Sequence, residues 1–125
     1  MCVTILIVED DEMAQGLFVT ILKNTDYVIK VVDTCDEAIK LIRKNSYDVI
    51  LTDVETPGKY NGVDLVEEVM ENDPSQKIIV MTGNGMHCDQ VKVLSNARMY
   101  GAVHAMLKPL HNQELKDIVK RYAYG

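Results

Sequence analysis

Short, uninterrupted runs of Val- and Ile-rich apolar residues alternate along the chain with amphipathic helical patterns, and this alternation limits the folds that the chain can adopt. The first run is Val3–Val8, in which apolar residues follow one another instead of alternating with polar ones. Further runs occupy residues 27–32, 49–52, 78–82 and 102–107. Continuous apolar runs of this length are typical of strands covered on both faces, as in parallel sheets.

The segments that separate or follow these runs carry apolar residues at helical spacing. Apolar positions at i, i+3, i+4, i+7 and i+8 lie on one face of a helix. The five stripes are Ala14, Leu17, Phe18, Ile21 and Leu22; Cys35, Ala38, Ile39 and Ile42; Leu65, Val66, Val69 and Met70; Val91, Leu94 and Ala97; and Leu115, Ile118, Val119 and Tyr122. Pro74 is expected to end the third helix, because proline disfavours helical geometry in the residue before it.

The order of these elements predicts an α/β fold, a five-stranded doubly wound parallel sheet flanked by five helices. Right-handed crossovers between successive parallel strands place helices on both faces of the sheet. The chain has 125 residues and shows no repeat, linker or low-complexity segment. Since single domains most often have about 100–150 residues, we expect one domain over residues 1–125.

Charge and composition exclude several classes of protein. Lys and Arg number 13 against 19 Asp and Glu, and no run of five basic residues occurs, which argues against direct nucleic-acid binding. No uninterrupted apolar stretch is longer than residues 5–8, which is far shorter than the ~20 residues that span a bilayer. No basic segment that would indicate a signal peptide opens the chain. Cys2, Cys35 and Cys88 are odd in number and widely spaced, as expected of a reduced, cytoplasmic protein.

Polar residues gather where the predicted strands end. In doubly wound sheets, ligands bind outside the carboxyl ends of the strands, so these residues are expected to converge on one small cleft. The four strand ends read Glu9-Asp10-Asp11-Glu12, Thr52-Asp53-Val54-Glu55-Thr56-Pro57-Gly58, Thr82-Gly83-Asn84-Gly85 and Lys108-Pro109.

The chemistry of such a cleft follows from its residue types. Carboxylates pressed together repel one another, and a hard divalent cation such as Mg²⁺ relieves that repulsion. A carboxylate beside Mg²⁺ can attack phosphorus, while a nearby lysine and a hydroxyl stabilise the phosphoryl charge. Each motif also has an ordinary structural explanation, such as an acidic helix start or a strand-end turn. Their joint placement is what favours the phosphoryl-transfer interpretation.

In this order the motifs resemble the receiver domain of two-component response regulators, a family that includes the chemotaxis response regulator. The resemblance extends from Ile5 to about Tyr122. It implies the flavodoxin-like strand order 2-1-3-4-5. The segments that carry it are residues 5–12, 47–53, 79–83, 101–102 and 108–110.

The resemblance also implies a metal site. Asp53 would be the phosphoacceptor and a metal ligand. Asp10 would bind Mg²⁺, with Glu9 binding it directly or through water. The backbone carbonyl of Glu55 would be the third protein ligand.

Two further residues acquire roles from the resemblance. Thr82 would donate a hydrogen bond to the phosphoryl group, and Lys108 would pair with its oxygens. The peptide bond between Lys108 and Pro109 would be cis, which helps to hold the lysine in place.

The resemblance implies a signalling domain rather than an enzyme with an external substrate. A sensor histidine kinase or a histidine phosphotransfer protein would donate the phosphoryl group, and water would later remove it. The donor would dock on the first helix, residues 13–24. The output would reach a downstream protein target or an output domain outside this sequence, and a homodimer is possible.

The chain departs from the usual receiver pattern in three places. Ala105 stands where the family places an aromatic switch residue, and the neighbouring His104 points to the opposite face of its strand. The loop after Pro57 is one residue longer than usual. The segment between Thr82 and Lys108 is also longer, with the extra residues expected within 83–90.

Four other interpretations remain. The chain could be a pseudo-receiver that acts as a protein interaction module without phosphorylation. It could be a phosphatase of the haloacid dehalogenase type, but Glu55 stands where that motif needs a second Asp. A flavodoxin-like nucleotide binder would have a Gly-rich loop after the first strand, where this chain has acids. His87-Cys88-Asp89 could bind a metal, although adjacent residues rarely present all their donors to one ion.

Overall fold

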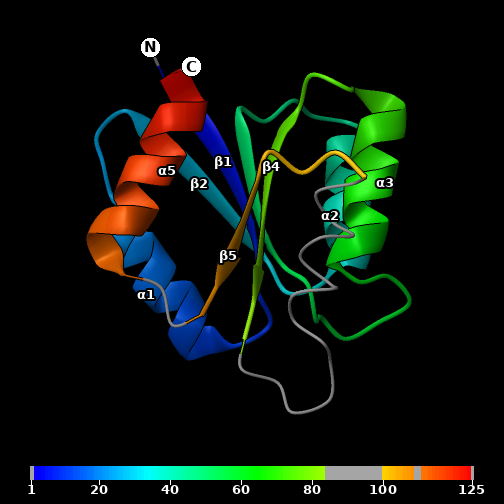
Figure 1. Cartoon of the computed structure of the whole chain (residues 1–125), viewed down its shortest axis with the longest axis horizontal. Helices are drawn as coiled ribbons and strands as arrows, with labels where there is room; N and C mark the ends of the chain where they lie inside the picture. The colour runs from blue at the N-terminus through cyan, green and yellow to red at the C-terminus, as the bar shows by residue number, and fades with distance from the viewer. Residues whose placement is uncertain (1, 84–99, 109–110, 125) are drawn as a thin grey trace.

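Five parallel strands form the centre of the molecule (Figure 1). The computed structural model describes residues 2–83, 100–108 and 111–124. The strands pair in the order β2-β1-β3-β4-β5, which confirms the predicted topology. They are β1 (Val3–Val8), β2 (Tyr27–Val32), β3 (Val49–Asp53), β4 (Lys77–Thr82) and β5 (His104–Leu107).

Two pairs of helices cover the two faces of the sheet (Figure 1). Helices α1 (Glu12–Leu22) and α5 (Asn112–Tyr124) lie on one face. Helices α2 (Cys35–Ile42) and α3 (Gly62–Asn72) lie on the other. The predicted helical stripe Val91, Leu94 and Ala97 lies outside the described residues. Four of the five expected helices are therefore described, and the α/β fold class is confirmed.

The central strands are buried on both sides, as their continuous apolar runs predict. In β1, Ile5 and Ile7 pack toward α1 and α5, whereas Leu6 and Val8 pack toward α2 and α3. All four side chains are fully buried. No helix in the described parts of the chain is long and apolar enough to cross a membrane.

The observed element boundaries follow local chemistry. Helix α3 ends at Asn72, as predicted from Pro74. Strand β5 begins at His104, two residues later than expected. The cause is a turn at Gly101, where the backbone has φ = 120°, so regular strand geometry begins only after Val103. The N–H of Val103 already donates to the Ile78 carbonyl at 2.9 Å.

The loop between β3 and α3, residues 54–61, returns close to the strand that it leaves. Asn61 caps α3 in a capping box with Asp64, where each side chain accepts a hydrogen bond from the other residue's backbone N–H. Gly62 then packs directly on the backbone after β3. A Cβ atom at this position would lie 2.7 Å from the carbonyl oxygen of Asp53. Only glycine lets the helix start this close to the strand end.

We therefore expect Gly62→Ala to destabilise the fold. The added methyl group would meet backbone atoms of Asp53 and Val54 that have little room to move, and overpacking of this kind costs about 1–3 kcal/mol. The matched control is Gly16→Ala in α1, where a Cβ atom meets nothing within 4 Å and is expected to raise stability by about 0.5–1 kcal/mol. Urea unfolding of both variants measures the difference. Equal stabilities would contradict the close approach.

Candidate functional site

Side chains from three strand ends meet at the carboxyl edge of the sheet. Glu9 and Asp10 follow β1, Asp53 is the last residue of β3, and Lys108 follows β5. Carboxylate oxygens of Glu9, Asp10 and Asp53 all lie within 4.8 Å of one another. The structure therefore brings together four of the residues predicted from sequence.

The Lys108 ammonium bridges two of these carboxylates. Its Nζ atom donates to Glu9 Oε2 at 2.8 Å and to Asp53 Oδ2 at 2.9 Å. The backbone N–H of Lys108 donates to the Thr82 carbonyl at 2.8 Å, which anchors the lysine to the end of β4. The lysine is thus fixed at both its backbone and its charged end.

Burial makes the charges at this site interact strongly. Glu9 is 2% exposed, and burial raises the pKa of its carboxyl despite the opposing hydrogen bond from Lys108. Burial alone would lower the pKa of Lys108, but its hydrogen bonds to Glu9 and Asp53 outweigh this effect and raise it. When all three carboxylates are ionised, the single ammonium leaves two negative charges uncompensated. A divalent cation would neutralise them.

The acidic run after β1 divides between two tasks. Glu9 and Asp10 belong to the carboxylate cluster. Asp11 caps α1, because its side chain accepts a hydrogen bond from the N–H of Met13, and Glu12 is the first helical residue. Glu9 Oε1 accepts from the N–H of Asp11 at 3.2 Å. Asp11 and Glu12 therefore begin a helix, whereas Glu9 and Asp10 belong to the candidate site.

Asp53 is almost fully buried at the end of β3 and keeps a small exposed area. It is 8% exposed, and its Oδ1 atom accepts from the N–H of Glu55 at 3.3 Å. This bond places the Glu55 peptide beside the cluster. Thr82, at the end of β4, is 1% exposed and pairs with Leu107 in the sheet.

The donor set fits Mg²⁺. Hard carboxylate and carbonyl oxygens are its preferred protein ligands, and it keeps several waters in an octahedral shell. Glu9, Asp10 and Asp53 each offer a carboxylate oxygen. The net charge and the chemistry of this cluster agree with the predicted site.

The two residues near the expected aromatic position lie on opposite faces of β5, as predicted. Ala105 packs on the face covered by α2 and α3. The ring of His104 lies 6.3 Å from the ring of Tyr122, which belongs to α5 on the other face. His104 therefore does not stand in for the aromatic residue that Ala105 replaces.

Several predictions concern residues that the structure does not describe. These are the cis bond between Lys108 and Pro109, most of the long segment within 83–90, and the possible metal ligands His87-Cys88-Asp89. They remain predictions.

The sequence pattern does not single out Gln15, which nevertheless contacts the acidic loop. Its side-chain Nε2 donates to the Glu9 carbonyl at 2.5 Å and to Asp33 Oδ1 at 2.7 Å. A polar residue in the first turns of an amphipathic helix gives no local signal that its side chain reaches back to a strand end.

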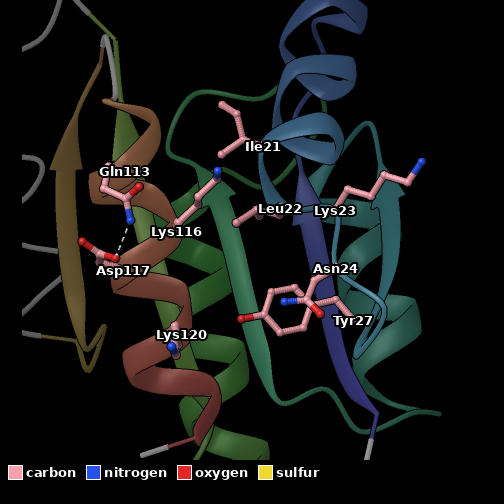
Figure 2. A pocket seen from close by; sticks show the side chains of 9 residues that line it. All are labelled: Ile21, Leu22, Lys23, Asn24, Tyr27, Gln113, Lys116, Asp117 and Lys120. Carbon is pink, nitrogen blue, oxygen red and sulfur yellow. Dashed lines mark hydrogen bonds between the residues drawn. The ribbon is translucent and has the colours of Figure 1, made fainter.

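A separate cavity of about 290 Å³ lies between the end of α1 and α5 (Figure 2). Residues from α1, the following turn, the start of β2 and α5 line it, and the side chains of Gln113 and Asp117 are hydrogen-bonded at its rim. Glu9, Asp10 and Asp53 do not line this cavity. It is therefore distinct from the cluster at the strand ends.

Comparison with known proteins places this arrangement in a family. Residues 5–120 match the response regulator receiver domain. This chain belongs to the receiver domain family of two-component response regulators. Such receiver domains are signalling modules that work with histidine kinases or phosphotransfer proteins.

Individual relatives agree with the family assignment. The chain is 30% identical to the two-component response regulator-like protein APRR3 of Arabidopsis thaliana over 91% of its length. It is 28% identical over 90% of its length to the two-component response regulator PhoP of Pseudomonas aeruginosa. The beryllofluoride-activated NtrC4 receiver domain dimer, solved in solution, superposes with a TM-score of 0.84 at 28% identity, covering 96% of this chain and 95% of that one. This receiver domain spans 23% of the length of APRR3 and 48% of that of PhoP.

We expect Mg²⁺ to stabilise this receiver domain through the carboxylate cluster. A ligand that binds only the folded state at 100 times its Kd raises the free energy of unfolding by about 2.7 kcal/mol. Asp10→Asn should remove most of this gain, whereas Glu12→Gln, two residues along in the same acidic run, should keep it. Urea unfolding with Mg²⁺ and with EDTA measures both. An equal loss in the two variants would indicate general charge screening instead of a defined site.

Proposed function

We propose that this receiver domain accepts a phosphoryl group on Asp53 in a Mg²⁺-dependent reaction. The observation that carries the proposal is the geometry around that carboxylate. Its Oδ2 atom accepts a hydrogen bond from the Lys108 ammonium, its Oδ1 atom accepts one from the N–H of Glu55, and the carboxylate lies within 4.8 Å of those of Glu9 and Asp10. A nucleophile, a fixed ammonium group and an acidic cluster therefore meet at the carboxyl edge of the sheet.

The proposed donor is the phosphohistidine of a sensor histidine kinase or of a phosphotransfer protein. An Asp53 carboxylate oxygen attacks the phosphorus atom, the P–O bond forms, and the P–N bond breaks. The electron pair of that bond leaves with the imidazole nitrogen, which takes up a proton. The same site later admits water, which attacks phosphorus, breaks the P–O bond to Asp53 and releases inorganic phosphate.

The proposed metal ligands are the carboxylates of Asp10 and Asp53 and the backbone carbonyl of Glu55, with Glu9 binding directly or through water. When bound, Mg²⁺ neutralises phosphoryl oxygens and the cluster's surplus negative charge. Donor groups that are fixed before reaction stabilise the transition state without reorganisation. The pairing of Lys108 with both Glu9 and Asp53 provides such a fixed group.

Phosphorylation would change the contacts of both Lys108 and Thr82. The phosphoryl oxygens would compete with Glu9 for the ammonium, and the Thr82 hydroxyl would donate to the new group. Because the Thr82 carbonyl accepts from the N–H of Lys108, a shift at β4 reaches β5 directly. We propose that this backbone link, instead of an aromatic ring at Ala105, carries the switch to the output surface.

We expect acetyl phosphate with Mg²⁺ to add a single phosphoryl group to the wild-type protein. Intact-mass spectrometry would detect the adduct. It should be absent from Asp53→Asn and from samples with EDTA, because each lacks a part of the proposed site. Asp117→Asn, a change of the same type on the exposed face of α5, should retain it.

The same series tests the alternative that this chain is a phosphorylation-independent interaction module. Some receiver domains accept phosphate only from a protein donor, so beryllofluoride, which mimics a phosphoryl group, serves as a second probe. An NMR titration should show Mg²⁺-dependent beryllofluoride binding that Asp53→Asn abolishes. Absence of both the phosphoryl adduct and beryllofluoride binding would contradict the proposed function and favour the interaction module.

A further inference from the structure

The segment at which β2 passes into α2, residues 33–36, is linked by hydrogen bonds to both loops that carry the proposed metal ligands. One loop, residues 9–11, follows β1, and the other, residues 54–61, follows β3. Neither the family resemblance nor the sequence pattern assigns a role to this segment. Asp36 hydrogen-bonds the loop after β3 directly, whereas Asp33 reaches the loop after β1 through the side chain of Gln15.

The first set fixes the loop after β3. The Asp36 carboxylate accepts from the N–H of Lys59 at 3.3 Å and from the N–H of Tyr60 at 3.1 Å, one hydrogen bond to each oxygen. This two-point contact holds the part of the loop that includes the extra residue predicted from sequence. The loop also carries Glu55, whose carbonyl is a proposed metal ligand.

Glycine at position 58 is what lets Asp36 reach the loop. Its backbone has φ = 110°, and a Cβ atom there would lie 2.9 Å from Asp36 Oδ1. A second contact supports the first, since the Thr56 hydroxyl lies 3.3 Å from both Cys35 Sγ and the Tyr60 carbonyl. The lengthened loop therefore contacts the first turn of α2 at two residues, Cys35 and Asp36.

The second set fixes the loop after β1. Asp33 Oδ1 accepts from the Gln15 side chain at 2.7 Å, and the same Gln15 nitrogen donates to the Glu9 carbonyl at 2.5 Å. Asp33 thereby orients an amide that holds the peptide between Glu9 and Asp10. Asp33 and Asp36 do not belong to the carboxylate cluster, so their contribution to it is indirect.

We propose that Asp33 and Asp36 are positioning residues for the metal site, a proposal that rests on the function inferred above. Mg²⁺ demands near-ideal octahedral geometry, so its affinity depends on how firmly the ligand-bearing loops are held. Residues that orient metal ligands typically account for 10–100-fold in metal affinity. The segment after the edge strand β2 would thus raise the Mg²⁺ affinity of a site to which it contributes no ligand.

The first test is Mg²⁺ binding by isothermal titration calorimetry. Asp36→Ala should weaken binding by about 10-fold, because both loop hydrogen bonds are lost. Asp36→Asn keeps one acceptor oxygen and should fall between this variant and wild type, and it provides the test if the alanine variant fails to fold. The matched control is Glu37→Ala, which removes an equal charge from an exposed position in the same helical turn. It should bind within twofold of wild type.

The contact of Asp33 with Gln15 can be tested with a conservative variant that keeps the hydrogen bond. Asp33→Ala should weaken Mg²⁺ binding by about 10-fold, whereas Asp33→Asn retains an oxygen that accepts from Gln15 and should stay within threefold of wild type. A purely electrostatic effect of the negative charge would weaken both variants equally, and that result would overturn the positioning role of Asp33.

A metal-free measurement separates this inference from the proposed function. Amide hydrogen exchange followed by NMR, in EDTA, should show protected N–H groups at Lys59 and Tyr60 that exchange about 10-fold faster in Asp36→Ala. Wild-type Mg²⁺ binding together with unchanged affinity in Asp36→Ala would overturn the positioning role alone. A wild-type protein that does not bind Mg²⁺ would overturn both the metal-dependent function and the positioning role, even if the exchange data show the contact.

Discussion

The contact of the Lys108 ammonium with Glu9 and Asp53 is the interaction on which the rest of the site depends. It requires three strands to end at one edge of the sheet, which parallel strand order provides. It also keeps two buried carboxylates in close proximity, since an uncompensated buried charge would shift its pKa and become neutral. The two negative charges that remain favour a divalent cation. One fixed ammonium thus stabilises two buried carboxylates and leaves the cluster with a surplus of negative charge.

The loops around this contact are held by groups that take no part in the chemistry. Gly62 lets α3 start against the backbone of Asp53, and a capping box at Asn61 fixes the exit of the loop. Asp36 and Gln15 secure the remaining loop segments from α2 and α1. A site that must bind a metal and then a phosphoryl group needs this support, because small displacements of ligands weaken both.

The strands and most of the site were predictable because their signals are local. Continuous apolar runs mark buried parallel strands, and the residue after each run marks the strand end, so Glu9, Asp53 and Lys108 could be located from sequence. The start of β5 was predicted too early, since the positive φ of Gly101 delays the entry of the chain into the sheet. Gln15 could not be predicted, because its two partners come from different loops and only folding brings them together.

The order of the strands and helices along the chain and the polar residues at the strand ends follow from the amino-acid sequence. Hydrophobic periodicity and strand-end chemistry are properties of neighbouring residues, so they can be recognised before the fold is known. Which acids of the run after β1 join the cluster, and which begin a helix, depends on the packed fold. The packed fold also decides that Asp36 reaches across to the loop after β3. Such contacts join residues more than 20 positions apart, and their existence depends on distances that only the packed sheet and helices define.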